Sequence, residues 1–317
     1  MKLIDVTKQL NTEDKCLAYV EKMRWPNGVC CVHCGVQNVS TITRKKAGDN
    51  KRARIYQCLE KECGKQFSAT SGTIFNDTHL GLDKWFMAIA MICEAKKGMS
   101  AMQLQRHLGV NYRTAWHMAH RIREAMQDGG DLLTGVVETD TTWMTPRKPR
   151  KGRPQPKNPN RSAVLGMIER GGKLRLIPVA DEKFVILAPV MRDNIDKDAL
   201  LQTDKAVVFE KVGHYLDFRG HRMINHIISY AEGQNHTNTI ENAFSLLKRG
   251  VYGTYHHVSE QHLPRYLAEF DFRYNARASV GYSDRQRMDK ALGGIEGKRL
   301  TYRRTRSTPD QHAAPVA

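Results

Sequence analysis

The chain has 317 residues, of which 50 are lysine or arginine and 33 are aspartate or glutamate, so its net charge is +17. This length favours about two domains, each large enough to bury a core, and the charge favours a polyanionic partner, nucleic acid before an anionic membrane surface. No run of about 18 apolar residues is present to span a bilayer, and residues 1–15 lack the apolar core of a signal peptide. We therefore expect a cytoplasmic protein without a membrane partner.

Seven cysteines is an odd count, and four of them form two short pairs, in CVHCG (31–35) and CLEKECGKQF (58–67). Paired cysteines that are each followed by glycine predict a zinc ribbon, here over residues 16–72, in which four thiolates hold Zn²⁺ tetrahedrally. So small a fold has little core, and metal binding would supply much of its folding free energy. Cys30 competes with Cys31, but Cys-x2-Cys is the more common spacing. The expected ligands are Cys31, Cys34, Cys58 and Cys63.

Residues 78–128 are predicted to be helical. LGLDKWFMAIAMICEAKKG has apolar residues at helical spacing and ends at Gly98. SAMQLQRHLGVNYRTAWHMAHRIREAM predicts a short helix, a turn at 108–110 and a longer helix whose inner face carries Ala115, Met118 and Ile122. This is the order of a helix-turn-helix, whose second helix enters the major groove of DNA; a three-helix unit with no role in DNA binding is the alternative. The expected groove-facing residues are Asn111, Tyr112, Arg113, Thr114 and His117.

From residue 132 the apolar pattern changes to a period of two. Three antiparallel strands are predicted by the segments GVVETDTTW, SAVLGMIER and KLRLIPVA. A helical stretch around EKFVILAPVM then precedes a fourth strand, which ends on Asp204. A long helix then follows in HTNTIENAFSLLKRG (236–250). This order predicts an α/β, RNase H-like catalytic domain over residues 132–280, preceded by the zinc ribbon and the helix-turn-helix.

Two basic segments flank or interrupt that domain. Residues 145–161 hold seven lysines or arginines and no acid, which is typical of a solvated linker or of a clamp on a phosphate backbone. Residues 281–317 are basic and poor in apolar side chains, so we expect a disordered tail with nonspecific affinity for DNA.

Three carboxylates stand out in the second half of the chain. Asp140 lies within a strand, where aspartate is disfavoured, Asp204 ends the fourth strand, and Glu241 lies near the start of the long helix. In an RNase H-like topology the central strands are neighbours and the helix packs over them, so these positions can converge. Carboxylates held together repel each other unless cations neutralise them, which predicts Mg²⁺ or Mn²⁺. A pair of such ions supports in-line phosphoryl displacement.

The long helix also carries two cations. At 100° per residue Lys248 lies on nearly the same face as Glu241, at the edge of an apolar stripe. Lys248 and Arg249 can therefore grip the phosphates of a DNA strand, the lysine as a point charge and the arginine as a fork.

Two alternatives remain open at this site. Asn238 can cap the helix with Glu241 three residues later, which is the pattern of a capping box and not of a metal ligand. A separate acidic cluster competes with Asp204 for the second position, and its members are Asp193, Asp196 and Asp198.

The motifs resemble those of bacterial insertion-sequence transposases of the DDE type, in the group with an N-terminal zinc ribbon, a helix-turn-helix and an ISXO-like catalytic domain, akin to the eukaryotic Merlin superfamily. The resemblance covers residues from about 20 to 278 and is carried by CGKQFSATSGTIF, SAMQLQRHLGV, VVETD, HTNTIE with LLKRG, GTYHHVS and EFDFRYNAR. It implies that Asp140, Asp204 and Glu241 are the metal-binding triad and that Lys248 is the basic residue after the glutamate. Members usually have glutamate after the first aspartate, where this chain has Thr141.

These motifs predict a DNA transposase. It would bind double-stranded DNA, both at terminal inverted repeats and at the target, cleave phosphodiester bonds at the element ends, and transfer the freed strand. The resemblance also implies a homo-oligomer, because two ends are joined together. One alternative is a catalytically silent, domesticated transposase that acts as a DNA-binding regulator, and another is an RNase H-like nuclease that cleaves without strand transfer.

Overall fold

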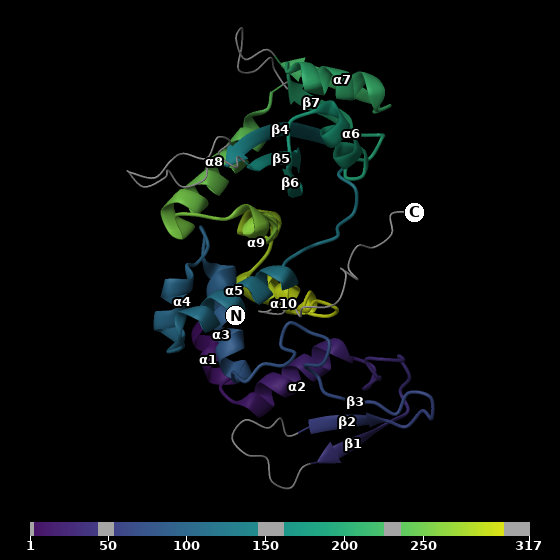
Figure 1. Ribbon diagram of the computed structural model, residues 1–317, viewed down its shortest axis with the longest axis vertical. Coiled ribbons are helices and arrows are strands. Elements are labelled where there is room, and N and C mark those ends of the chain that lie inside the picture. Colours follow the sequence, from purple (N-terminus) through teal and green to yellow (C-terminus); the bar gives the residue numbers. More distant parts are fainter. Residues whose placement is uncertain (1–2, 44–53, 145–161, 225–235, 301–317) are drawn as a thin grey trace, which may run out of the picture.

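The protein is described by a computed structural model that covers residues 3–43, 54–144, 162–224 and 236–300. Figure 1 shows a small sheet at one end of the long axis, a group of helices in the middle, and a larger sheet with its own helices at the other end. The basic segment 145–161 and residues 301–317 of the predicted tail lie outside the described residues.

The N-terminal region is a small antiparallel sheet on which a helix packs. Its elements are α1 (Leu3–Gln9), α2 (Glu13–Arg24), β1 (Val39–Thr43), β2 (Arg54–Cys58) and β3 (Gln66–Phe67), with the strands in the order β1-β2-β3. Trp25 at the end of α2 meets Tyr56 and Phe67 edge-on, with ring centroids 5.5 and 5.9 Å apart. These three rings belong to the same buried cluster as the central helices, so the small sheet shares a core with them.

The central region contains the two helices predicted for the helix-turn-helix. Its elements are α3 (Leu82–Glu94), α4 (Ala101–Leu108), α5 (Tyr112–Ala125) and α10 (Asp284–Gly293). Ser100 and Gln103 form a capping box at the start of α4, and Gly109 ends that helix in the left-handed conformation, at φ 62°. Asn111 then caps α5. These local signals explain why the helix boundaries could be predicted from the sequence.

The prediction of a disordered tail from residue 281 is wrong for its first part. Ser283 and Gln286 form a capping box, and α10 buries Met288, Ala291 and Leu292 in the cluster that contains α3. The apolar side chains recur at helical spacing, but they are few among many charges, so the basic composition hid the pattern. The described chain continues from α10 to Leu300.

The larger sheet has five strands in the order β6-β5-β4-β7-β8. Its strands are β4 (Val136–Met144), β5 (Ser162–Glu169), β6 (Leu174–Val179), β7 (Leu200–Asp204) and β8 (Gly220–Ile224). Strands β4, β5 and β6 form an antiparallel meander, whereas β7 pairs parallel to β4 and β8 parallel to β7. The first four of these strands follow the chain order that the sequence predicted, and with β8 the sheet has the RNase H-like arrangement of three antiparallel strands followed by two parallel ones.

The sequence did not predict α7 (Val207–Tyr215) or β8. Strand β8 reads GHRMI, and residues such as glycine and arginine give little of the alternation by which a strand is detected. It forms because it adds to the open edge of β7, where five of its residues pair in register.

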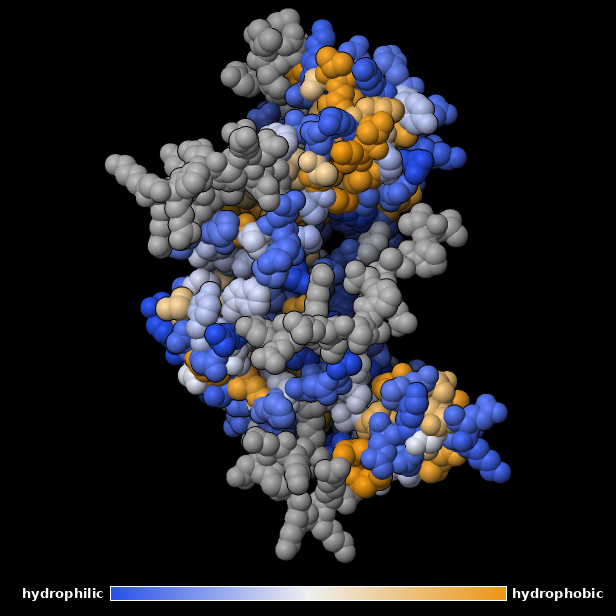
Figure 2. Space-filling model, in the orientation of Figure 1, coloured by the Kyte–Doolittle hydropathy of each residue, from blue (hydrophilic) through white to orange (hydrophobic). Residues whose placement is uncertain are grey.

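Helices cover both faces of this sheet. On one face lie α6 (Phe184–Arg192) and α7; on the other lie α8 (Asn238–Gly250), its continuation η1 (Val251–Tyr255), and α9 (Leu263–Asn275). Two single turns complete the chain, η2 (Glu260–His262) and η3 (Ala278–Val280). Figure 2 shows an apolar patch over α6 and α7, where Val185, Val207 and Tyr215 are 72%, 65% and 71% exposed.

Helix α9 protects the open edge of β6. Asn275 accepts a hydrogen bond from the Leu174 N–H and donates one to its carbonyl, and Asp271 accepts from the Leu176 N–H. These side chains take the place of a neighbouring strand, which prevents edge-to-edge association.

A buried ion network joins α5 to α9. Glu269 is fully buried and accepts hydrogen bonds from Arg123 of α5, from Arg273 of its own helix, and from the Tyr255 hydroxyl at 2.7 Å. Because Tyr255 ends the π-helix that continues α8, this one carboxylate links the central helices to the helix that carries Glu241. Burial would raise the pKa of Glu269, but the two arginines hold it below its ordinary value.

We expect His120 to make folding sensitive to acid. This fully buried side chain lies among Trp116, His262 and Tyr266, and neither ring nitrogen has a hydrogen-bond partner among the described residues. Burial, and then the charge of Arg123, lowers the pKa of His120 to about 2.

Since the folded-state pKa lies below the unfolded one, the unfolded chain binds the proton first, and stability falls as the pH drops below about 6.5. Urea unfolding of wild type and His120→Phe at several pH values measures this effect. Below pH 6.5 the free energy of unfolding of wild type should fall, relative to that of His120→Phe, by about 1.4 kcal/mol for each unit that the pH drops. A difference that does not change with pH would refute the buried neutral histidine.

Candidate active site and metal centre

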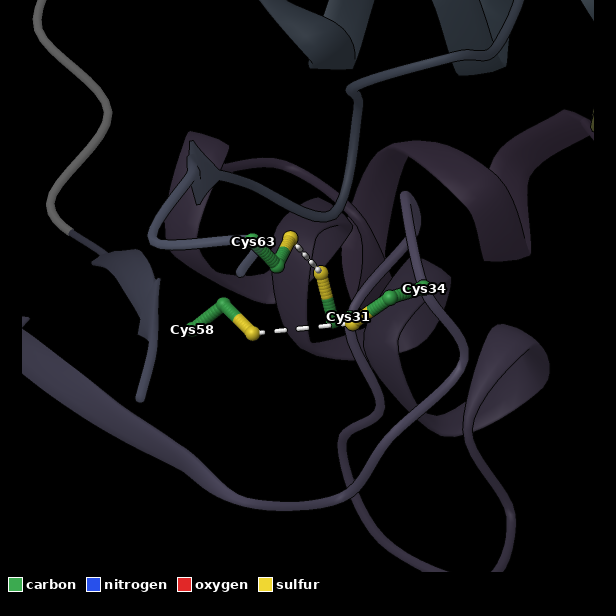
Figure 3. Close-up of side chains that lie close together, drawn as sticks. All are labelled: Cys31, Cys34, Cys58 and Cys63. Atoms are coloured by element: carbon green, nitrogen blue, oxygen red, sulfur yellow. Dashed lines mark hydrogen bonds between the residues drawn. The ribbon is translucent and has the colours of Figure 1, made fainter. Parts of the chain in front are cut away.

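Four cysteines form the predicted metal centre of the small sheet. Cys31 and Cys34 lie in the loop after α2, Cys58 ends β2, and Cys63 lies in the turn before β3. Figure 3 shows the four side chains pointing toward one another. Their sulfur atoms all lie within 4.8 Å of each other, with 3.7 Å between Cys31 and Cys63 and 3.6 Å between Cys34 and Cys58.

This geometry fits Zn²⁺. Tetrahedral bonds of about 2.3 Å from the metal to each sulfur place neighbouring sulfurs about 3.8 Å apart. The His33 N–H points at the sulfur of Cys31, at 3.4 Å, while the His33 side chain is exposed. Gly35 and Gly64 follow the two pairs with φ 78° and 52°, conformations in which glycine is favoured. Cys30 lies outside this cluster, whereas Cys31 belongs to it, as expected for the first ligand.

The start of α8 is held by a buried carboxylate from the sheet. Glu138 of β4 is fully buried and accepts hydrogen bonds from the N–H groups of Thr239 and Ile240, at 2.9 and 3.1 Å, and from the Thr239 hydroxyl. Negative charge at a helix N-terminus is favoured by the unpaired N–H groups and the helix dipole. Arg170, at the end of β5, neutralises this carboxylate at 2.8 Å and also bonds to Gln202 of β7.

The predicted capping box at Asn238 is therefore wrong. Asn238 is the first residue of α8, and Thr237 before it makes no side-chain cap. The Thr237 hydroxyl instead donates to the Glu241 carboxylate at 3.0 Å. The capping box was an open alternative because its spacing is local, whereas the actual cap comes from a strand about 100 residues earlier.

Asp140 and Asp204 lie on neighbouring parallel strands. The pairs in register end at Thr139 and Thr203, so each aspartate is the next residue of its strand. Asp140 pairs with Gly166 of β5. A Cβ added to Gly166 would come within 2.7 Å of the side chains of Ile240 and Phe244 of α8. Glycine thus lets the helix approach the sheet next to the first carboxylate.

The charges of the other two carboxylates act on Asp140. The pKa of Asp140 is raised to about 7, first by burial and then by the negative charges of Asp204 and Glu241. Their oxygens do not form a cluster within 4.8 Å, because the four cysteines are the one such group among the described residues. A cation between them would relieve their repulsion.

A cavity of about 890 Å³ opens in front of Asp140. The carboxylates of Asp140 and Glu241 line it together with the cations of Lys248 and Arg249, whereas Asp204 does not. The other lining residues are Lys97, Thr141, Thr142, Phe244, Ser245, Tyr252 and Gly253. The structure thus brings together four of the predicted residues in one cavity and places Asp204 beside the first of them.

The competing acidic cluster lies elsewhere. The Asp196 N–H donates to the carbonyl of Leu133, just before β4, and the chain then enters β7. Asp193, Asp196 and Asp198 therefore lie at the opposite end of β7 from Asp204, so they do not replace it at this cavity.

Sequence reasoning missed three residues near the site. Glu138 has a signal in the sequence, because it precedes Asp140 by two positions and therefore shares its face of the strand. Glu182 accepts a hydrogen bond from the Thr141 hydroxyl at 2.7 Å and contributes to the raised pKa of Asp140. Neither Glu182 nor Lys97 has a local signal, because both come from loops that approach only in the fold.

The candidate DNA-binding residues lie at the start of α5. Asn111, Tyr112 and Arg113 are exposed, and the Asn111 side chain accepts from the Thr114 N–H at 2.8 Å. Arg113, Thr114 and His117 line a second cavity of about 450 Å³ beside α3. Arg249 lies apart from them, at the first cavity. Within the part of the chain that the structure describes, no helix is long and apolar enough to cross a membrane.

The cysteine assignment can be tested by zinc content. We expect purified wild type to hold one zinc ion per chain and Cys31→Ser to lose it, since three thiolates leave the tetrahedral site open. Cys30→Ser is the matched control, because Cys30 is adjacent in sequence but outside the cluster. Zinc loss in Cys30→Ser with retention in Cys31→Ser would reverse the assignment.

The cap at α8 can be tested by stability. Glu138→Ala leaves Arg170 without its buried partner and two N–H groups without an acceptor, so we expect a loss of about 3–5 kcal/mol in the free energy of unfolding. Glu241→Gln, on the same helix but exposed, should change it by less than about 0.5 kcal/mol. Equal effects of the two substitutions in urea unfolding would contradict the cap.

Comparison with known protein families finds matches to two separate segments of the chain. Residues 11–66 match the transposase zinc-ribbon domain, and residues 132–275 match the ISXO2-like transposase domain. The chain is 26% identical over 283 residues to an "uncharacterized protein in transposable element ISH50" of Halobacterium salinarum, a match that covers 84% of this chain and 92% of that protein.

Solved structures give weaker matches. The crystal structure of the Mos1 strand transfer complex is 10% identical with a TM-score of 0.28, over 66% of this chain and 74% of that one. The cryoEM structure of a simian T-cell lymphotropic virus intasome in complex with PP2A regulatory subunit B56 gamma is 13% identical with a TM-score of 0.29, over 56% and 66%. The fold assignment therefore depends on strand order and on the domain matches. By these matches residues 132–275 are similar to an ISXO2-like transposase domain, and residues 11–66 are similar to a transposase zinc ribbon.

Proposed function

We propose that the protein is the DNA transposase of a transposable element, which cleaves phosphodiester bonds at the element ends and joins the freed 3′-hydroxyl to target DNA. The observation that supports this best is the cavity beside the RNase H-like sheet. There, Asp140 and Glu241 face Lys248 and Arg249, and Asp204 lies on the neighbouring strand. An origin in a bacterial insertion sequence and kinship with the Merlin superfamily stay predictions from the motifs.

The donor set suits Mg²⁺ or Mn²⁺. Asp140, Asp204 and Glu241 offer only carboxylate oxygens, the ligands that hard divalent cations prefer. The pKa of Asp140 is raised first by burial and then by the charges of the other two carboxylates, and a bound cation would offset both effects. When bound, such ions activate the attacking oxygen and stabilise the leaving one. Thr141 follows Asp140 but takes no ligand away, because its hydroxyl is directed to Glu182.

The chain's own residues position the DNA. Lys248, as a point charge, and Arg249, as a planar fork, would bind phosphates of the strand in the cavity. Glu138 fixes the N-terminus of α8 and so sets where Glu241 stands relative to Asp140. The position of Glu241 is thus set by a helix that the sheet anchors and not by a loop.

The central helices would bind the terminal inverted repeats. In this proposal α4 and α5 form a helix-turn-helix, and the exposed start of α5, with Asn111, Tyr112 and Arg113, enters the major groove. The net charge of +17 supports a DNA partner. A homo-oligomer would hold two ends together, and the apolar patch over α6 and α7 offers a surface for self-association.

The proposal is tested by cleavage of a duplex that carries an element end, with Mg²⁺ or Mn²⁺ present. We expect Asp140→Asn, Asp204→Asn and Glu241→Gln each to slow cleavage at least about 100-fold, since several kcal/mol of transition-state stabilisation depend on the metal site. Asp198→Asn is the control, because this exposed aspartate lies at the opposite end of β7 and should cleave like wild type.

The outcomes separate the possible functions. Binding of the duplex without any nicking by wild type would favour a DNA-binding regulator. Nicking without joining to a target duplex would favour a nuclease of the same fold. Full activity of Asp204→Asn or Glu241→Gln would show that the triad is assigned wrongly.

A further inference from the structure

One cation of the catalytic cavity comes from outside the larger sheet and its helices. Lys97 follows α3 in the turn of residues 95–98 and lines the same cavity as Asp140, Glu241 and Lys248. Figure 1 shows the C-terminal end of α8 next to the central helices, which is where this turn lies. No sequence motif pointed to Lys97.

Two glycines fix this turn against the end of α8. Gly98 closes the turn with φ 88°, and a Cβ there would lie 1.7 Å from the Tyr255 hydroxyl of η1. On the other side, a Cβ on Gly250 would lie 3.3 Å from the Lys97 carbonyl. At both glycines the turn of residues 95–98 packs closely against the end of α8 and η1, because neither glycine has a side chain. This packing sets the position of Lys97 relative to Lys248.

The cations around the cavity form no ion pairs with the part of the chain that the structure describes. Lys97 and Arg249 are exposed, Lys248 is half-buried, and none of the three forms an ion pair with a described residue. The Arg249 guanidinium donates to the Ser245 carbonyl, at 3.3 Å. Three cations thus remain available to a polyanion at the mouth of a cavity that holds two carboxylates.

We propose that Lys97 binds a backbone phosphate of the DNA strand in the catalytic cavity, opposite Lys248 and Arg249. This inference rests on the proposed function and adds a contact to it from the central helices. Two residues after the turn, Ser100 caps α4, so the same stretch of backbone leads directly into the α4 and α5 pair. DNA held in the cavity would therefore be bound by the region proposed to recognise the element ends as well.

The test is the salt dependence of DNA binding without divalent metal, measured by anisotropy of a fluorescently labelled duplex of mixed sequence. Each phosphate contact contributes about 0.9 to the slope of log affinity against log salt concentration. We expect Lys97→Gln to lower the slope by that amount, which is a loss of about eightfold in affinity at 0.1 M salt if the two lines meet at 1 M. Lys97→Arg should restore the slope.

Lys96→Gln is the matched control. Lys96 precedes Lys97 in the same turn and is exposed, but it lines a neighbouring cavity and not the catalytic one. Its slope should equal that of wild type, and thermal melting of all three variants should be unchanged. An equal fall in slope for Lys96→Gln and Lys97→Gln would reduce the effect to general surface charge and overturn the inference.

The result is separable from that of the proposed function. If wild type cleaves the element end and Lys97→Gln keeps the wild-type slope, the inference fails and the transposase proposal stands. If wild type binds the duplex with a slope that depends on Lys97 but never cleaves it, the phosphate contact stands and the catalytic proposal fails.

Discussion

The buried carboxylate of Glu138 at the N-terminus of α8 is the interaction on which the arrangement of Asp140, Asp204 and Glu241 depends. A charged group without solvent is costly unless it is paired, and here it is paired with Arg170 and with the N–H groups of the helix. Arg170 in turn contacts β7 through Gln202. One network therefore fixes the helix and both central strands, and these three elements carry Glu241, Asp140 and Asp204.

A second buried carboxylate, Glu269, connects α8 and η1 to the central helices. Glu269 binds Arg123 of α5 and the hydroxyl of Tyr255 at the end of η1. Helix α8 is thus held at its start by the sheet and at its far end by the central helices. Since the Ala95–Gly98 turn packs on the same end, the cavity is bounded by two regions that are distant in sequence.

The parts of the fold that could be predicted have local causes. The cysteine pairs with their glycines, the caps at Ser100 and Asn111, and the strand alternation around Asp140 all act within a few residues of chain. The errors have the same origin. Asn238 looks like a cap because only local spacing was considered, and α10 was missed because a basic composition outweighed three apolar residues at helical spacing.

The sequence by itself predicted the four cysteines that cluster in the small sheet and the chain order of the larger sheet's first four strands, and it nominated Asp140, Asp204 and Glu241 as carboxylates that can converge. Only the tertiary structure decided that Glu138 caps α8, that Glu182 lies beside Asp140, and that Lys97 lines the cavity of Asp140 and Glu241. The reason is that each pair of cysteine ligands lies within a few residues of chain, so that its spacing can be read from the sequence. A helix cap from a strand, or a lysine from another region, exists only when the backbone brings the two segments together.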